Sequence, residues 1–415
     1  MRDRDLYAKL LGIEAPWSVR EVDARLDAGE VEVFISFDGT ARVTCPECGA
    51  ACGRHDTRTR SWRHLDTMQY QTLLTADVPR VRCKEHGVKQ VKVPWAEPGS
   101  RFTALFEALV IDWLHEGSTS AVARMLGMSW DEVDGVMSRA VARGLRRRKA
   151  EPLRSIGLDE TSFQKRHEYV TVVYDCERAR VVDVLDGRTQ QAVEDFFWDT
   201  PIEDLETIES VSMDMWAPYV AAVREHVPDA EDKIAFDRFH VAKHIGDGVN
   251  KVRVREHAEL QELGIDTLKG TRYLWLQNPE NMKAGNRLRF EGLRDTALRV
   301  ARAWAMKETA RHLWSYKTRG WARRAWTRLI DWMARSRLEP MVKVSRTLRE
   351  HLWGILNAIV LRVTNAHLEA VNAKIQKLKK RACGYRNRAR FRDAILFHCG
   401  RLDLYPQLAA THPNS

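Results

Sequence analysis

The sequence predicts a multidomain α/β protein whose main domain is a mixed sheet flanked by helices. Strand-like runs and helical stretches alternate over residues 154–248, the order expected of a mixed α/β sheet. Short β-like runs separated by polar turns fill residues 30–96, and helical patterns dominate from residue 250 to about 380. We therefore expect a β-rich module, a sheet core and a large helical region.

The composition is that of an ordinary folded protein. Of its 415 residues, 44% are hydrophobic and 30% are charged, which supports roughly two to four domains with cores of their own. The N-terminus shows no signal peptide, and no run of about 18 uncharged apolar residues occurs. We expect a cytoplasmic protein with no membrane partner.

The positive charge of the chain is clustered. Lys and Arg together number 67 against 57 for Asp and Glu, which gives a net charge of +10. The runs at 143–149 and 374–392 are far more basic than the average. Either run alone could be a solvated helix face, but the two together favour a nucleic acid as the partner.

Two pairs of metal-ligand residues stand toward the two ends of the β-rich module. Such crowding of cysteines without a signal peptide indicates metal ligation rather than disulfides. A C-x2-C turn and a C-x2-H turn brought together by β structure fit a closed tetrahedral Zn²⁺ site, which would fold a docking module at residues 1–98. The predicted ligands are Cys45, Cys48, Cys83 and His86. Cys52 and His55 are alternative ligands, and free or buried thiols are the alternative to a metal.

The same module contains the basic segment "RTRSWRHLD" at residues 58–66. Arg58, Arg60 and Arg63 are candidate contacts to phosphates or bases. The alternative is a solvated strand face.

Residues 118–145 predict a helix-turn-helix, which we place in a domain spanning residues 99–150. A turn at Gly127 is followed by the capping box Ser129-x-x-Glu132, which opens a second helix. That helix begins with three acids, and acids repel phosphate. DNA contact is therefore assigned to later arginines: Arg139, Arg143, Arg146 and Arg147. A dimerisation or packing helix is the alternative.

Three acids stand where a divalent cation could bind. Asp159 and Asp214 each follow a strand-like run, and Glu369 lies on a predicted helix whose other charges are almost all basic. Close carboxylates repel unless a cation lies between them. Mg²⁺ prefers oxygen ligands, and two such ions can clamp a phosphodiester. Glu160 and Asp175 compete with these acids for the role.

Several motifs in order resemble the DDE transposases of bacterial insertion sequences, specifically the insertion-sequence "L three" family. They are "CPECG", "RCKEHGVKQVKVPWA", "IGLDETSF", "VSMDMWAPYV", "AFDRFHVAKH" and "NAHLEAVNAKIQKLKKRACGYRN", and they cover nearly the whole chain. The resemblance implies a ribonuclease-H-like core whose catalytic triad is Asp159, Asp214 and Glu369. It also implies an all-helical insertion between the last two acids.

The resemblance further implies the reaction and the partners. Water activated by Mg²⁺ or Mn²⁺ cuts the transposon end, and the released 3′ hydroxyl attacks target DNA. The partner would be double-stranded DNA, bridged by a homodimer or a higher homo-oligomer in a bacterial cytoplasm, associated with the nucleoid. The core would comprise residues 151–249 and 351–415, and the insertion residues 250–350.

The chain departs from the family pattern at two positions. The family often shows C-x2-C at the second knuckle, where this chain has Cys83-x2-His86, and Cys383 precedes "GYRN" where an aromatic residue is common. We expect the second departure to be a packing change. Asp237 and His240 resemble a D-x2-H element of related transposases. They are expected either to cap and pack a helix or to order the active site and contact terminal DNA.

Further DNA contacts are expected in the insertion and in the last helix. Aromatic and basic side chains at residues 272–275 could stack on unpaired bases, although core packing is the alternative for the tryptophans. The assigned contacts are Arg272, Trp275, Lys379, Lys380, Arg381 and Arg386.

Two other functions remain as alternatives from the sequence. A non-catalytic DNA-binding regulator derived from a transposase would bind DNA without cutting it. A nuclease acting on junctions or RNA hybrids would share the acids but would not need two N-terminal docking modules.

Overall fold

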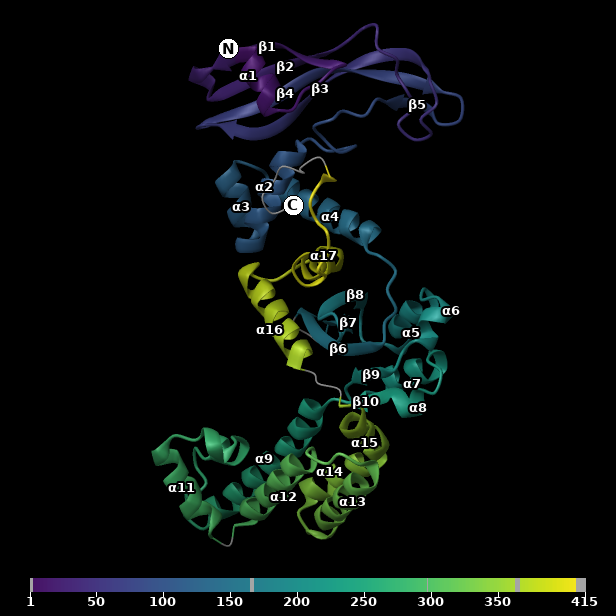
Figure 1. Ribbon diagram of the computed structural model, residues 1–415. Coiled ribbons are helices and arrows are strands. Elements are labelled where there is room, and N and C mark those ends of the chain that lie inside the picture. The colour runs from purple at the N-terminus through teal and green to yellow at the C-terminus, as the bar shows by residue number, and fades with distance from the viewer. Residues whose placement is uncertain (1–2, 165–167, 297, 363–365, 408–415) are drawn as a thin grey trace. The chain divides into compact units, whose positions relative to one another are not determined.

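The computed structural model describes residues 3–164, 168–296, 298–362 and 366–407 (Figure 1). The chain divides into two compact units. One comprises residues 1–149 together with the residues after Gly400, and the other comprises residues 150–400. The sequence-based division assigned all of 351–415 to the core, whereas the described residues after Gly400 cluster with the N-terminal unit.

The N-terminal unit contains a five-stranded sheet with the order β1-β2-β4-β3, in which β5 also pairs with β4. Edge-to-face contacts among Trp17, Trp62 and Trp95 fill its core, with ring centroids 4.9 and 5.5 Å apart. The elements are α1 (Asp3–Leu10), β1 (Trp17–Arg25), β2 (Glu30–Phe37), β3 (Gly53–Thr67), β4 (Tyr70–Cys83) and β5 (Gly87–Gln90).

Three helices follow in the same unit: α2 (Ala104–Glu116), α3 (Thr119–Leu126) and α4 (Trp130–Arg147). Gly127 ends α3 in the left-handed conformation, with φ of 61°, and its amide caps the helix. The Ser129–Glu132 capping box opens α4 with both reciprocal hydrogen bonds present. These observations confirm the predicted helix-turn-helix. Its helix boundaries could be predicted from the sequence because the capping contacts join residues only a few positions apart.

The second unit contains a mixed sheet with the order β10-β9-β6-β7-β8. Strands β6, β7 and β8 are antiparallel, whereas β9 and β10 run parallel to β6. This is the topology expected of the ribonuclease-H-like core. The strands are β6 (Ser155–Gln164), β7 (Glu168–Asp175), β8 (Arg180–Asp186), β9 (Ser210–Met213) and β10 (Ile234–Phe236).

Helices cover this sheet. α16 packs on β6, α17 on β8 and α15 on β10 (Figure 1). An ion pair of 2.9 Å between Arg392 and Asp183 ties α17 to β8. The surrounding helices are α5 (Gln190–Trp198), α6 (Ile202–Glu206), α7 (Ala217–His226), α8 (Ala230–Lys233), α15 (Leu352–Leu361), α16 (Ala366–Arg381) and α17 (Arg388–Cys399).

A helical region follows β10 directly, and its buried side chains continue the hydrophobic core of the mixed sheet. Trp275, Phe290 and Trp326 are almost fully buried there, together with Met306 and Met333. Its helices are α9 (Arg238–Glu262), α10 (Arg272–Leu276), α11 (Ala284–Arg294), α12 (Arg299–Leu313), α13 (Arg319–Arg335) and α14 (Glu339–Glu350). Across the described residues, none of the helices is both long and apolar enough to span a bilayer.

Candidate active site and zinc centre

Asp159 and Asp214 emerge at the same edge of the mixed sheet. Parallel strands β6 and β9 pair Gly157 with Ser212. Asp159 lies two residues beyond Gly157, and Asp214 lies two residues beyond Ser212. Because neighbouring strands are about 4.8 Å apart, this equal register brings the two acids to adjacent positions.

Asp237 joins them from the next strand. It follows Phe236, the last residue of β10, and its amide donates to the carbonyl of Met213 over 2.9 Å. Its carboxylate caps α9 by accepting from the Phe239 amide, and it pairs with His240 Nδ1 at 2.9 Å. The pKa of His240 is raised, first by this hydrogen bond and further by the charges of the nearby aspartates, including Asp214.

The helix α16 presents a polar face to β6. Asn372 donates to Asp159 Oδ2, Gln376 Nε2 donates to Thr161 Oγ1 over 3.0 Å, and Lys379 Nζ donates to a β6 carbonyl over 2.7 Å. Glu369 precedes Asn372 by three residues, so helical spacing puts it on the same face. It lines a cavity of about 670 Å³ together with Ser212 and Asp237.

The surroundings of Asp159 disfavour an uncompensated negative charge. Burial raises the pKa of Asp159, and the charge of Asp237 raises it further, whereas His240 and the Asn372 hydrogen bond oppose the shift. Carboxylate oxygens are the ligands that Mg²⁺ prefers. In the described part of the chain, however, Asp159, Asp214 and Glu369 do not converge as tightly as the thiol cluster described below.

The competing acids have other partners. Glu160 pairs with Arg188 over 3.1 Å. Asp175 is fully buried, and its carboxylate pairs with Arg178 and Arg180, each over 3.2 Å. It stands opposite Ile156, toward the other end of β6 from Asp159. Both carboxylates are therefore already paired with arginines.

The four predicted zinc ligands converge. Their ligand atoms, from Cys45, Cys48, Cys83 and His86, all lie within 4.8 Å of one another. The thiol of Cys83 has its pKa lowered to about 6, first by the His86 backbone amide and then by the His86 side chain. A thiolate at neutral pH is the form that binds zinc.

The alternative ligands lie outside this cluster. The thiol of Cys52 contacts the carbonyl of Ala50 at 3.4 Å, and the Nδ1 of His55 lies 3.3 Å from Arg82. Four cysteine and histidine ligands of this kind are the number that a structural zinc site uses, and they would leave no position open for a substrate.

Comparison with known proteins finds one family that contains the zinc module, the helix-turn-helix and the mixed-sheet domain. Residues 156–395 match the DDE transposase domain of the ISL3 family. The chain belongs to this family. Residues 91–141 match the helix-turn-helix domain of transposase family ISL3, and residues 41–86 match the zinc finger of the transposases IS204/IS1001/IS1096/IS1165. The chain is therefore a DDE transposase with a zinc ribbon and a DNA-binding helix-turn-helix.

Full-length relatives agree with this assignment. The transposase of insertion sequence element IS1001 from Bordetella parapertussis is 27% identical over 397 residues, which cover 94% of this chain and 97% of the relative. The transposase of IS1557 from Mycobacterium tuberculosis is 28% identical over 419 residues, covering 93% of each.

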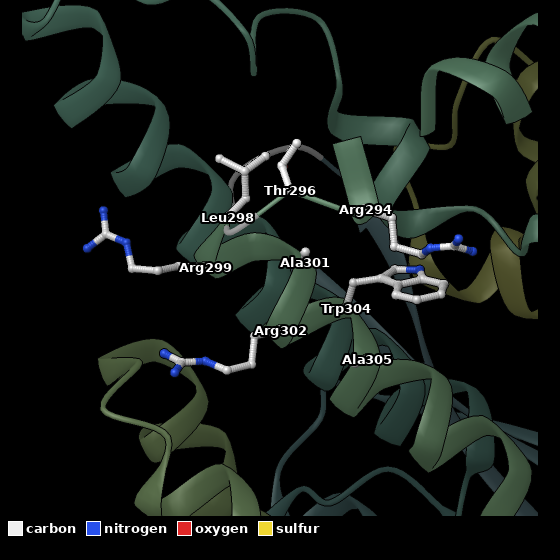
Figure 2. Close-up of a pocket in the computed structure, with 8 residues that line it drawn as sticks. All are labelled: Arg294, Thr296, Leu298, Arg299, Ala301, Arg302, Trp304 and Ala305. Atoms are coloured by element: carbon white, nitrogen blue, oxygen red, sulfur yellow. The ribbon is translucent and has the colours of Figure 1, made fainter. Parts of the chain in front are cut away.

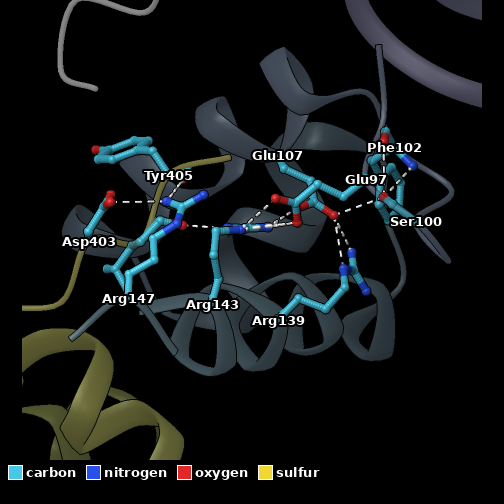
Figure 3. A network of polar contacts seen from close by, with 10 residues as sticks. Glu97, Ser100, Phe102, Glu107, Arg139, Arg143, Arg147, Asp403 and Tyr405 are labelled. Atoms are coloured by element: carbon cyan, nitrogen blue, oxygen red, sulfur yellow. Dashed lines mark hydrogen bonds and ion pairs between the residues drawn. The ribbon is translucent and has the colours of Figure 1, made fainter. Parts of the chain in front are cut away.

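The structure of the transposase corrects one DNA contact expected on α4. Arg143 is only 2% exposed, and its guanidinium donates to Glu97, to Glu107 and to the carbonyl of Leu404 (Figure 3). The prediction that Arg143 contacts DNA is wrong, because an interior guanidinium cannot reach a phosphate.

The other arginines of α4 predicted to contact DNA differ in how free they are to bind a phosphate. Arg139 binds Glu107 at 2.6 Å, and Arg147 binds the Tyr405 carbonyl at 2.6 Å and Asp403 at 3.1 Å (Figure 3). Arg146 is exposed. It is thus the arginine of this run that lies best placed for a phosphate.

The other side chains predicted to contact DNA also differ in their exposure to solvent. Trp275 is fully buried against Phe290, with ring centroids 5.5 Å apart, so the prediction that it stacks on bases is wrong. Arg63 is mostly buried, pairs with Asp66 at 2.5 Å and lies over the ring of Phe106. Several predicted contacts are exposed: Arg58, Arg272, Lys380, Arg381 and Arg386. Lys379 is half-buried, and Arg60 lies over Trp62.

Sequence reasoning missed a basic cavity of about 530 Å³ at the start of α12. In Figure 2, Arg299 and Arg302 point to one side and Arg294 to the other. Arg299 pairs with Glu256 and Glu259, and Arg294 pairs with Asp295. These arginines all lie between residues 294 and 302 but are separated by acidic and uncharged residues, so they do not form the consecutive basic run that marked the other candidates.

Proposed function

We propose that this transposase cuts DNA at the ends of its element and joins the released 3′ hydroxyl to target DNA, using Mg²⁺ or Mn²⁺ held by Asp159, Asp214 and Glu369. One observation carries the proposal: equal register on two parallel strands puts Asp159 and Asp214 side by side, with α16 tied to Asp159 through Asn372. A divalent cation bound there supplies Lewis-acid chemistry for phosphodiester cleavage.

The chain's own groups would then position that chemistry. Asn372 holds one oxygen of Asp159, which fixes the direction in which the other points. The Asp237–His240 pair puts a donor beside the same acids. The sheet limits the backbone freedom of both aspartates, because Asp159 lies within β6 and Asp214 directly follows β9.

We propose double-stranded transposon ends and target DNA as the partners, contacted through exposed basic side chains. Their affinity should fall steeply with salt because phosphate contacts release counterions. The exposed candidates are Arg58, Arg146, Arg272, Lys380, Arg381 and Arg386, and the half-buried Arg60 beside Trp62 is proposed with them. Joining two ends requires that two or more copies act together, so a homodimer or larger assembly on DNA belongs to the same proposal.

Nicking of supercoiled DNA carrying the element ends tests the activity. Wild type should nick in Mg²⁺, and Asp159→Asn should not. Asn372→Ala should slow nicking by roughly 10- to 100-fold, the cost of losing a supporting hydrogen bond to a metal ligand. Glu160→Gln is the matched control, because Glu160 is the neighbouring acid and pairs with Arg188.

Equal nicking by wild type and Asp159→Asn would contradict the proposed site. Tight, salt-sensitive binding by wild type without nicking in any divalent metal would instead indicate a DNA-binding regulator.

A further inference from the structure

The cavity of about 670 Å³ that Glu369 lines has features that a metal site alone does not require. Its volume lies within the roughly 300–1,000 Å³ typical of small-molecule sites. Besides Glu369 and Asp237, it is lined by the first turn of α9, by the connection between α12 and α13 and by the end of α15. It is therefore a mixed acidic, aromatic and basic pocket next to the acids.

Two aromatic rings that line this cavity are exposed to solvent. Phe239 is 55% exposed and Tyr316 is 38% exposed. Trp314 forms a more fixed part of the wall, since it packs edge-to-face on Trp326 at 5.4 Å and lies under the guanidinium of Arg238 at 5.7 Å. An exposed ring beside an anchored one is suited to stacking on a planar ligand.

The basic side chains of the cavity are also available. Arg238 and Lys317 are exposed, and neither forms an ion pair with any carboxylate of the described chain. A ligand with a flat apolar ring and a phosphate would match both properties. A nucleotide has this chemistry.

The order of residues on α9 links the cavity to the chemistry. Asp237 caps α9, Arg238 is its first residue and Phe239 its second. A base stacked on Phe239 would therefore hold its own phosphate close to Asp237 and the neighbouring acids. A base inside a duplex is covered by its neighbours and cannot enter a pocket without leaving the stack. The ligand must therefore be an unpaired nucleotide.

We propose that this cavity holds one unpaired nucleotide at the transposon end while the acids act on the adjoining phosphate, with Phe239 and Tyr316 stacking on the base. Arg238 and Lys317 neutralise the flanking phosphates. The inference rests on the proposed function, since it takes the end of the element as the DNA that enters the site. Opening the end in this way places the phosphodiester beside the acids.

The test uses full-length Asp159→Asn, which should bind but not cut, and duplexes copied from the element end with 2-aminopurine at successive terminal positions. One position should brighten at least twofold on binding, as its base leaves the duplex stack. The substitution Phe239→Ala/Tyr316→Ala in the same background should abolish that signal. Trp321→Ala is the matched control, because Trp321 is 62% exposed nearby on α13 but does not line the cavity.

A second measurement separates base stacking from misfolding. With wild-type acids, Phe239→Ala/Tyr316→Ala should slow nicking of a fully paired end by roughly 5- to 150-fold, the range expected for losing stacking on one base. An end already mismatched at the responsive position should recover part of this loss. Melting temperatures of the variants should match those of Trp321→Ala.

No brightening at any position, no binding of the end, or equal signals from the cavity variant and its parent would overturn the inference. These outcomes differ from failure of the proposed function, which is equal nicking by wild type and Asp159→Asn. A brightening signal with no nicking by wild type would retain the nucleotide site and remove the cleavage claim.

Discussion

A methyl group added at Gly157 would lie 2.7 Å from Leu368 Cδ1, closer than real side chains approach. Leu368 is buried on α16, one residue before Glu369. Gly157→Ala should therefore destabilise the protein by about 1–3 kcal/mol through overpacking. It should also slow nicking, because the added methyl group displaces α16, which carries Glu369, from β6. Urea unfolding and the nicking assay measure the two effects.

The matching test is a double-mutant cycle with Leu368→Ala. The pair should be less destabilised than the sum of the two single changes, because the smaller residue makes room for the methyl group. Additive losses would show that the contact does not set the position of α16.

His64 should make the N-terminal unit sensitive to acid. It is hydrogen-bonded to Thr103 Oγ1 at 2.8 Å, and burial, with the charge of Arg63, lowers its pKa to about 4. The ordinary value in the unfolded chain is about 6.5. As the pH falls, the unfolded state binds the proton first, so stability is full above about 6.5 and is lost toward pH 4, by up to about 1.4 kcal/mol per pH unit.

Denaturant midpoints between pH 4 and 8 check this sign. His64→Gln should flatten the pH dependence relative to wild type over that window. The zinc ligands titrate in both proteins, so the difference between the two curves isolates His64. Parallel curves would contradict the assignment.

At the scale of elements, α4 depends on a buried ionic network. Arg143 is 2% exposed and binds two glutamates, of which Glu107 is 1% exposed. Arg143→Met should destabilise the N-terminal unit by about 1–3 kcal/mol, because Glu107 keeps Arg139 and Ser100 but loses its second guanidinium, and the Leu404 carbonyl loses its donor. Arg146→Met, on the exposed side of α4, should leave stability unchanged and weaken DNA binding. Thermal melting and a salt titration of binding distinguish the two roles, and an equally stable Arg143→Met would disprove the structural one.

The zinc centre joins two turns of the same sheet. Cys45 and Cys48 lie in the loop before β3, and Cys83 and His86 flank the turn from β4 to β5. Removing the zinc with a chelator should unfold the part of residues 30–96 that carries the ligands. The three thiols and one imidazole are held together by the metal there, and no apolar core would hold the two turns together without it. Hydrogen exchange of the full chain should show faster exchange in β4 and β5, and Cys52→Ser should behave as wild type. Unchanged exchange after zinc loss would contradict this.

At the scale of the whole molecule, repulsion among the acids should make stability depend on metal. Mg²⁺ binds the folded chain at Asp159, Asp214 and Glu369 in our proposal, and binding at 100 times the dissociation constant adds about 2.7 kcal/mol. The melting temperature of the 150–400 unit should therefore rise with Mg²⁺. The rise should vanish in Asp159→Asn/Asp214→Asn, and a metal-independent wild-type transition would count against the site.

Short-range features followed from the sequence alone. The C-x2-C and C-x2-H turns, the capping box at Ser129 and the strand run before Asp214 depend on residues a few positions apart. Their chemistry is carried by local spacing, so the zinc ribbon, the helix-turn-helix and the mixed sheet were predicted. The strand that the sequence ends at Asp159 continues to Gln164, because it pairs with β7 over that length. The catalytic assignment of the three acids stays a prediction, since their roles depend on a bound metal.

Only the tertiary structure decided which charged and aromatic side chains face solvent. Arg143 and Trp275 look like surface contacts in the sequence, but the carbonyl of Leu404, 261 residues away, and the ring of Phe290 enclose them. Asn372 contacts Asp159 across 213 residues, and nothing in its local pattern indicates this. Local spacing determines which elements form and which ligands pair, whereas burial arises from packing between distant segments, which no short pattern encodes.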